Sequence, residues 1–139
     1  NEAGIGGHVQ LRAVGSRMTE FTCRLTNLPP GLHGFHVHRL GDLREGCKSA
    51  CDHYNPRKST HGGRCGPQRH KGDLGNINAD EDGECSDVFR AEVALRDIVG
   101  RMLVVHADED DLGMGETAES LKTGSAGLRL ACGVIGLCD

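Results

Sequence analysis

Short stretches of alternating apolar and polar residues, separated by turn-forming clusters, constrain the fold of this chain more than any other feature. A period of two is typical of strands that bury one face. We expect strands at His8–Val14, Met18–Leu25, Gly34–His38, Phe89–Leu95, Arg101–His106 and Leu128–Leu137. The turn clusters are Pro29–Gly31, Gly72–Asn76 and Asp80–Gly83. Several short strands with this punctuation predict an all-β protein, an antiparallel sandwich or barrel.

Two long segments do not fit the strand pattern. The first runs from Arg39 to about Gly75 and is rich in histidine, cysteine, glycine and charge, and the second runs from Ala107 to about Gly127. Long loops inside a compact domain are usually functional or disordered, and the histidines in and beside these segments favour a functional role. A length of 139 residues fits one core, so we expect residues 1–139 to form a single domain.

Charge and hydropathy argue against two classes of partner. The formal net charge is −4 with neutral histidines, and no block of lysine and arginine occurs, so we expect no nucleic-acid partner. No apolar run approaches the about 20 residues of a membrane helix, so we expect no membrane partner. The opening residues NEAGIGG do not resemble a signal peptide, and this observation alone leaves the compartment undecided.

Most of the eight histidines lie between His33 and His70. His36 and His38 are two apart, which places them on one face of a strand, where imidazoles suit copper or zinc. An incidental His-x-His pair is the alternative. A second group, His53, His61, His70 and Asp73, has the donors of a tetrahedral zinc site, although a solvated polar loop would have the same composition. His106, at the end of an apolar run, is a candidate for one more ligand.

Several segments match the motifs of a known family in the same order. They are Gly31–His38, Asp52–Pro56, His61–Gly63, Arg69–Asn76, Leu103–His106 with Asp110–Gly113, and Gly127–Gly136. From about Leu28 onward the sequence resembles the copper–zinc superoxide dismutases. The resemblance implies an antiparallel Greek-key β-sandwich, or flattened barrel, with two long functional loops. It also implies conversion of superoxide to oxygen and hydrogen peroxide by alternate reduction and reoxidation of copper, beside a zinc ion.

The resemblance also implies a role for individual residues. The copper ligands would be His36, His38, His53 and His106, and the zinc ligands His53, His61, His70 and Asp73. His53 would bridge the two ions and carry a proton, and Arg129 would hold the superoxide anion beside the copper. Asp110 would link a copper ligand to a zinc ligand, and Lys122 and Thr123 would line the substrate channel. Cys47 and Cys132 would form the family's disulfide, His33 would be structural, and His8 is expected at the surface.

Five further cysteines leave two interpretations open. Cys51 could pair with Cys65 and Cys23 with Cys85, with Cys138 left over. Alternatively, these residues are small buried hydrophobes with free thiols. The cytoplasm is the favoured compartment, and extra disulfides would instead favour an extracellular location.

The N-terminus departs from the family pattern. His8–Val14 resembles the family's second strand, so the first strand is truncated, altered or missing, which affects a homodimer interface that this strand helps to form. Gly41, Val134, Gly136 and Leu137 resemble other parts of that interface. A copper chaperone is a further expected partner. Two alternatives to the enzyme remain, a dismutase-like domain of a copper chaperone and a non-catalytic metal-binding protein, and Arg129 argues against the second.

Overall fold

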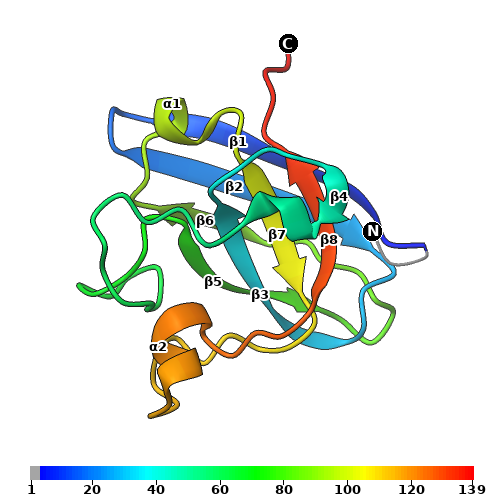
Figure 1. Cartoon of the computed structure of the whole chain (residues 1–139). Helices are drawn as coiled ribbons and strands as arrows, with labels where there is room; N and C mark the ends of the chain where they lie inside the picture. The colour runs from blue at the N-terminus through cyan, green and yellow to red at the C-terminus, as the bar shows by residue number, and fades with distance from the viewer. Residues whose placement is uncertain (1–3) are drawn as a thin grey trace.

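Two antiparallel sheets face each other in the computed structural model, which describes residues 4–139 (Figure 1). The first sheet has the strand order β1-β2-β6, and the second has the order β5-β3-β7-β8. Their bounds are β1 Gly6–Val14, β2 Met18–Thr26, β3 Gly31–His38, β5 Asp73–Ala79, β6 Val88–Ala91, β7 Met102–His106 and β8 Arg129–Val134. A short strand β4, Arg44–Cys47, lies within the first long loop. The expected all-β antiparallel sandwich is confirmed.

Helical structure is confined to three short segments of the described chain. They are the 3-10 helix η1, Lys48–Ala50, and the α-helices α1, Leu95–Ile98, and α2, Ala118–Thr123. Thr117 caps α2, because its side chain accepts a hydrogen bond from the backbone N–H of Ser120 (3.0 Å). Gly124 ends α2 with a φ of 74°, a left-handed conformation that glycine adopts without steric cost. No helix among residues 4–139 is long and apolar enough to cross a bilayer.

Five of the expected strands are present with shifted ends, and three expectations were wrong. The alternation over Phe89–Leu95 continues past the end of β6 at Ala91 and into α1. The cluster Gly72–Asn76, expected as a turn, is mostly the start of β5, which pairs with β3 through an irregularity between Gly34 and His36. The long segment after Arg39, expected to lack strands, contains β4. Glycine-rich composition thus concealed backbone pairing that depends on a distant partner strand.

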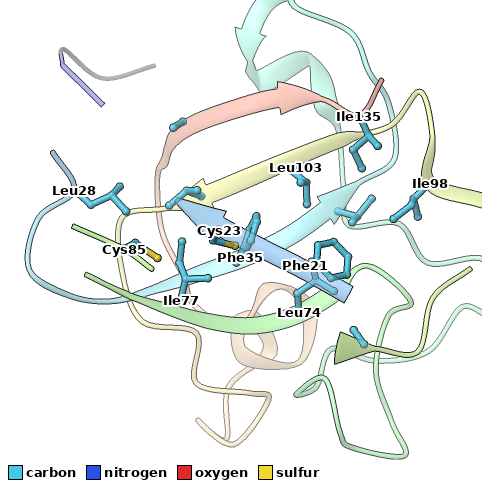
Figure 2. Close-up of a cluster of buried hydrophobic side chains, with 14 of the residues drawn as sticks. Phe21, Cys23, Leu28, Phe35, Leu74, Ile77, Cys85, Ile98, Leu103 and Ile135 are labelled. Atoms are coloured by element: carbon cyan, nitrogen blue, oxygen red, sulfur yellow. The ribbon is translucent and has the colours of Figure 1, made fainter. Parts of the chain in front are cut away.

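The core lies between the two sheets and is built from small aliphatic side chains around two phenylalanines. Phe21 of β2 and Phe35 of β3 are fully buried (Figure 2). Phe89 of β6 stacks on Phe21, with ring centroids 5.1 Å apart, and meets Phe35 edge-on at 6.2 Å. Phe35 and Val37 both face this core, so the alternation of β3 turns His36 and His38 to its other face.

The two sheets are open on one side. β1 is the edge of the first sheet and β8 the edge of the second. A cavity of about 420 Å³ lies between these edges, lined by residues that include Val9, Leu11, Leu103 and Ile135. β1 is the first strand of the described chain, and residues 1–3, on which the expectation of an altered first strand partly falls, lie outside the described residues.

Candidate metal centre

Neighbouring strands and one loop bring four histidines together. His36 and His38 come from β3, and His106 ends β7, which pairs with β3. His53 belongs to the first long loop, and an isolated antiparallel bridge between His38 and His53 holds that part of the loop against β3. Each of these side chains offers a nitrogen that lies within 4.8 Å of a nitrogen of every other. All four residues are at least 94% buried, so the cluster is shielded from water.

Hydrogen bonds from the ring nitrogen that points away from the cluster fix the orientation of two of these imidazoles. The Nδ1–H groups of His38 and His106 donate to the carbonyl oxygens of Cys51 (2.7 Å) and Gly127 (3.0 Å). Their free Nε2 atoms then face each other at 3.2 Å. Two lone pairs at this distance repel unless a proton or a cation lies between them, so the pair is suited to bind a metal ion.

A second set of donors converges on the carboxylate of Asp73, the first residue of β5. Its Oδ1 lies 2.9 Å from His53 Nδ1, 3.0 Å from His61 Nδ1 and 3.2 Å from His70 Nδ1. The other oxygen, Oδ2, accepts hydrogen bonds from the backbone N–H groups of Gly62 (3.1 Å) and His70 (2.8 Å). One oxygen is therefore held by the backbone, while the other meets three imidazoles.

Either His36 or His70 could be the fourth ligand of this second set, beside His53, His61 and Asp73. A nitrogen of His36 lies within 4.8 Å of donors of His53, His61 and Asp73. However, its Nε2–H donates to Asp110, whereas His70 Nδ1 lies 3.2 Å from both His53 Nδ1 and Asp73 Oδ1. His70 therefore fits the second set better, and His53 is common to both sets.

Two buried nitrogens test whether these residues fit metal ions. His36 Nδ1 and His61 Nδ1, one in each set, have no hydrogen-bond partner among the described residues. The 3.0 Å approach of His61 Nδ1 to Asp73 lacks hydrogen-bonding geometry. An unsatisfied buried polar atom is costly, and a cation would satisfy both nitrogens. Three imidazoles with one carboxylate suit zinc, and an all-imidazole set suits copper.

Asp110 connects the two sets. Its carboxylate accepts the Nε2–H of His36 on Oδ2 (2.6 Å) and the Nε2–H of His61 on Oδ1 (2.7 Å). Asn76 of β5 holds the backbone of Asp110 on both sides, since its side chain accepts from the N–H (2.7 Å) and donates to the carbonyl (2.9 Å). This carboxylate, 1% exposed, therefore orients one ring of each set.

The electrostatics of the centre favour neutral imidazoles in the all-histidine set and an ionised Asp73. Burial, followed by the charge of His53, holds the pKa values of His36 and His38 well below the usual range. Burial also lowers the pKa of His106, to about 4. In the second set, burial would lower the pKa of His61, but the carboxylates of Asp110 and Asp73 raise it to about 9. Burial would raise the pKa of Asp73, but the close imidazoles of His53, His61 and His70 hold it well below its usual range. Neutral imidazole and ionised carboxylate are the forms that bind metals.

A cavity of about 750 Å³ leads to this centre. Its lining includes His38, His53 and His106 from the first set, and also Lys122 and Thr123 of α2 and Arg129 of β8. The guanidinium of Arg129 donates to the carbonyl oxygens of Cys47 (2.7 Å) and Cys51 (2.6 Å). Its position at the cavity is thus fixed by the loop that precedes His53.

The disulfide implied by the family resemblance is present, and the five further cysteines are free thiols. Cys47 and Cys132 form a disulfide with Cα atoms 5.8 Å apart, which ties the end of β4 to β8. The pairings Cys51–Cys65 and Cys23–Cys85 are absent, and these thiols and that of Cys138 are free. Cys23 and Cys85 are buried as expected of small hydrophobes, whereas Cys65 and Cys138 are exposed.

Two histidines outside both sets lie where they were expected. His33 is buried, with Nδ1 2.8 Å from the carbonyl oxygen of His106 and Nε2 2.7 Å from that of Pro29. It therefore braces the strand end that carries His106. His8 is exposed on β1.

Sequence reasoning identified Asp110 but missed other residues that support the centre without binding to it. Asn76 was assigned to a turn, although it positions Asp110. A Cβ atom at Gly34 would lie 2.6 Å from that of Ala126, and one at Gly124 would collide with Asp110 and His61. The left-handed φ of Gly124 makes a side chain there still less acceptable. Only the glycine-rich context could have signalled these close approaches.

Comparison with known proteins identifies relatives of the whole described fold. The family model described as "Copper/zinc superoxide dismutase (SODC)" matches residues 5–135. A "Superoxide dismutase [Cu-Zn]" of Paramecium bursaria Chlorella virus 1 is 54% identical over 112 residues, covering 78% of this chain and 60% of the relative's length. The chain thus spans less than two thirds of that relative.

Two further relatives come from Onchocerca volvulus. A "Superoxide dismutase [Cu-Zn]" is 50% identical over 126 residues (86% of this chain, 80% of the relative), and an "Extracellular superoxide dismutase [Cu-Zn]" is 47% identical over 144 residues (98% and 72%). Among solved structures, a crystal structure of "the clock protein EA4" superposes with a TM-score of 0.95 at 39% identity, covering 99% of this chain and 90% of that one.

Proposed function

The chain belongs to the copper/zinc superoxide dismutase family, and from this premise we propose that it converts superoxide to oxygen and hydrogen peroxide. The proteins of this family are oxidoreductases, and copper and zinc are their cofactors. The observation that carries the proposal for this chain is the position of His53. Its imidazole is common to an all-histidine set and to a set that converges on Asp73.

We propose that His36, His38, His53 and His106 hold the copper and that His53, His61, His70 and Asp73 hold the zinc. Two observations support this division. The Nδ1–H groups of His38 and His106 are held by backbone carbonyls, which leaves their Nε2 atoms available to a metal. His36 Nδ1 and His61 Nδ1 have no hydrogen-bond partner among the described residues. Copper would supply the one-electron reduction and reoxidation, and zinc would hold His53 in place and tune its basicity. Because His53 Nδ1 belongs to the zinc set, we assign its Nε2 to the copper set and to the transfer of a proton toward the peroxide product.

We further propose that Arg129 holds the superoxide anion at the inner end of the cavity. A guanidinium is always charged and offers donors in a rigid fork, which suits a diatomic anion. Lys122 and Thr123 line the approach. Their place along the same cavity as three histidines of the copper set supports this assignment.

The proposal is tested by superoxide consumption of protein loaded with both metals, compared with protein loaded with zinc alone. We expect dismutation only with copper. Substituting His106→Ala should abolish the activity and leave zinc bound, because His106 lies outside the zinc set. His8→Ala, an exposed histidine on β1, is the matched control. Near-normal activity of His106→Ala with bound copper would contradict the ligand assignment.

The chaperone-module and non-catalytic alternatives are not favoured. Four histidines converge as one set and Arg129 lines the cavity beside them. A copper-delivery module has no need for an anion-binding guanidinium at a buried copper set. We propose instead that a copper chaperone is a partner that loads this chain, and that residues 1–139 act as one domain.

We propose a homodimer that uses the face formed by Gly41, Val134, Gly136 and Leu137. Leu137 is 90% exposed and Val134 43% exposed, which supports a role in association. Leu137→Asp should then shift the sedimentation coefficient toward that of a monomer. An unchanged coefficient, or a monomeric parent protein, would contradict the proposal.

For the compartment we propose the cytoplasm. Five free thiols are typical of a reducing environment. The alternative is an extracellular location, which is part of the name of one Onchocerca relative. Fractionation of the source cells decides between them.

A further inference from the structure

The cavity above the copper set contains more charged residues than the proposed function uses. Three cations line it, Arg39, Lys122 and Arg129, and three carboxylates line it as well, Asp52, Asp108 and Glu119. With neutral histidines these formal charges cancel, 3 − 3 = 0. The attraction of an anion therefore depends on where each charge lies along the cavity rather than on their sum.

Arg39 is the cation whose role is not accounted for. It follows His38 directly at the end of β3, and its backbone is fixed on both sides. The N–H donates to the carbonyl of Asp52 (2.8 Å), and the carbonyl accepts from the guanidinium of Arg101 (2.8 Å). Its own guanidinium is exposed and forms no ion pair or hydrogen bond with any residue in the described range 4–139.

Asp52 is the charge that opposes it. The same backbone hydrogen bond holds Asp52 beside Arg39, and Asp52 precedes His53 directly. Burial lowers the pKa of Arg129, and Asp52 is the first of the charges that raise it again, so this carboxylate lies within electrostatic reach of the anion-binding guanidinium. Asp52 lines the cavity and forms no ion pair with another described residue, so no direct partner neutralises its negative charge.

We propose that Arg39 is a further residue that attracts anions into the superoxide cavity and that the negative charge of Asp52 reduces this attraction. Together the two charges tune the association rate of the substrate. The proposal rests on the proposed function. It assigns Arg39 no part in the chemistry, because nothing places its guanidinium at the reacting atoms. Its effect is long-range attraction, which raises both the rate of encounter and the affinity of an anion for the copper set without a direct contact.

The test measures kcat/KM for superoxide as a function of salt in protein loaded with copper and zinc. Arg39→Gln should lower kcat/KM at low ionic strength roughly twofold, the factor that Coulomb's law in water gives for one charge about 10 Å away. Asp52→Asn should raise it roughly twofold. Both differences should disappear near 1 M salt, where the screening length is only about 3 Å.

Arg17→Gln is the matched control, because Arg17 is an exposed arginine on the β1–β2 turn and does not line this cavity. Its net charge change equals that of Arg39→Gln. Equal rates for the Arg17 and Arg39 variants at every salt concentration would overturn the proposal, since only total charge would then matter.

A binding measurement separates this proposal from the proposed function. Azide, a linear monoanion, is titrated into copper-loaded protein and followed by the change in the copper absorption spectrum. Arg39→Gln should weaken azide binding at low salt and Asp52→Asn should strengthen it, even if the parent protein consumed no superoxide. Unchanged azide affinity in both variants would overturn the role of Arg39 and leave the dismutase assignment standing.

Discussion

At the scale of single residues, the centre depends on groups that fix the metal ligands as much as on the ligands. Asp110 shows this most clearly, because one carboxylate accepts from His36 and from His61. Neither ring could keep its orientation by itself, since each has only one other nitrogen and that nitrogen has no hydrogen-bond partner in the described protein.

Substituting Asp110→Asn should therefore weaken both sites. The amide keeps one accepting oxygen but gains two N–H donors, so one of the two imidazole N–H groups loses its acceptor. We expect copper or zinc affinity to fall by about 10–100-fold, as is typical for such outer partners. Competition with a chelator measures this change, and Asp97→Asn, at an exposed carboxylate on α1, is the control. Unaltered affinity for both metals would contradict the role given to Asp110.

The buried thiols give a second prediction at this scale. Burial raises the pKa of Cys23 to about 12 and that of Cys85 to about 11. A thiolate is the reactive form, so Cys65 and Cys138 should react with a thiol reagent first, half-buried Cys51 next, and Cys23 and Cys85 only on unfolding. Peptide mapping by mass spectrometry during the reaction distinguishes these classes. Rapid modification of Cys23 in the folded protein would contradict the prediction.

The same raised pKa values affect stability at high pH. The unfolded chain releases these thiol protons near the ordinary value of 9.0, whereas the folded protein retains them. The unfolded state therefore binds fewer protons above that pH, and the free energy of unfolding falls as pH rises further.

At the scale of elements, the first long loop is held to the second sheet by a covalent and a polar connection. Cys47, at the N-terminus of η1, is bonded to Cys132 of β8. Three residues before Cys132, Arg129 donates to the carbonyls of Cys47 and Cys51. Figure 1 shows β4 and the adjacent η1 lying beside β8. The loop that carries His53 is thus anchored just before that residue.

Replacing both cysteines, Cys47→Ser with Cys132→Ser, should lower the free energy of unfolding by roughly 4–5 kcal/mol. The bond closes a separation of 85 residues, and the chain-entropy model gives this magnitude for such a loop. Urea unfolding measures the loss, and Cys138→Ser, at an exposed free thiol, is the control. A double variant as stable as the parent would show that Arg129 and local packing hold the loop without the bond.

At the scale of the whole molecule, the sequence predicted the features that local periodicity and motifs encode, and missed those that depend on distant partners. The strands β1, β2, β3, β7 and β8 were found because alternation reports one buried face. The pair His36 and His38 was found for the same reason. β5 was missed because Gly72 and Gly75 imitate a turn, although β3 supplies its hydrogen bonds.

The supporting contacts were beyond sequence reasoning for the same physical cause. Asn76 reaches Asp110 across 34 residues, and Arg129 reaches the Cys51 carbonyl across 78. No local pattern encodes such separations, because they arise only when the long loops fold against the second sheet. The resemblance to a family supplied the ligand sets, but it did not point to the charges of Arg39 and Asp52.

The shared carboxylate of Asp110 has a thermodynamic consequence. An ion that enters one set orders His36 or His61, and through Asp110 it restricts the other ring before the second ion arrives. Binding of the second ion then costs the protein less conformational entropy, so binding of either ion raises the affinity for the other. Linkage requires the two enhancements to be equal, whichever ion is added first. Loading of this protein with its two metals is therefore expected to be cooperative in both orders.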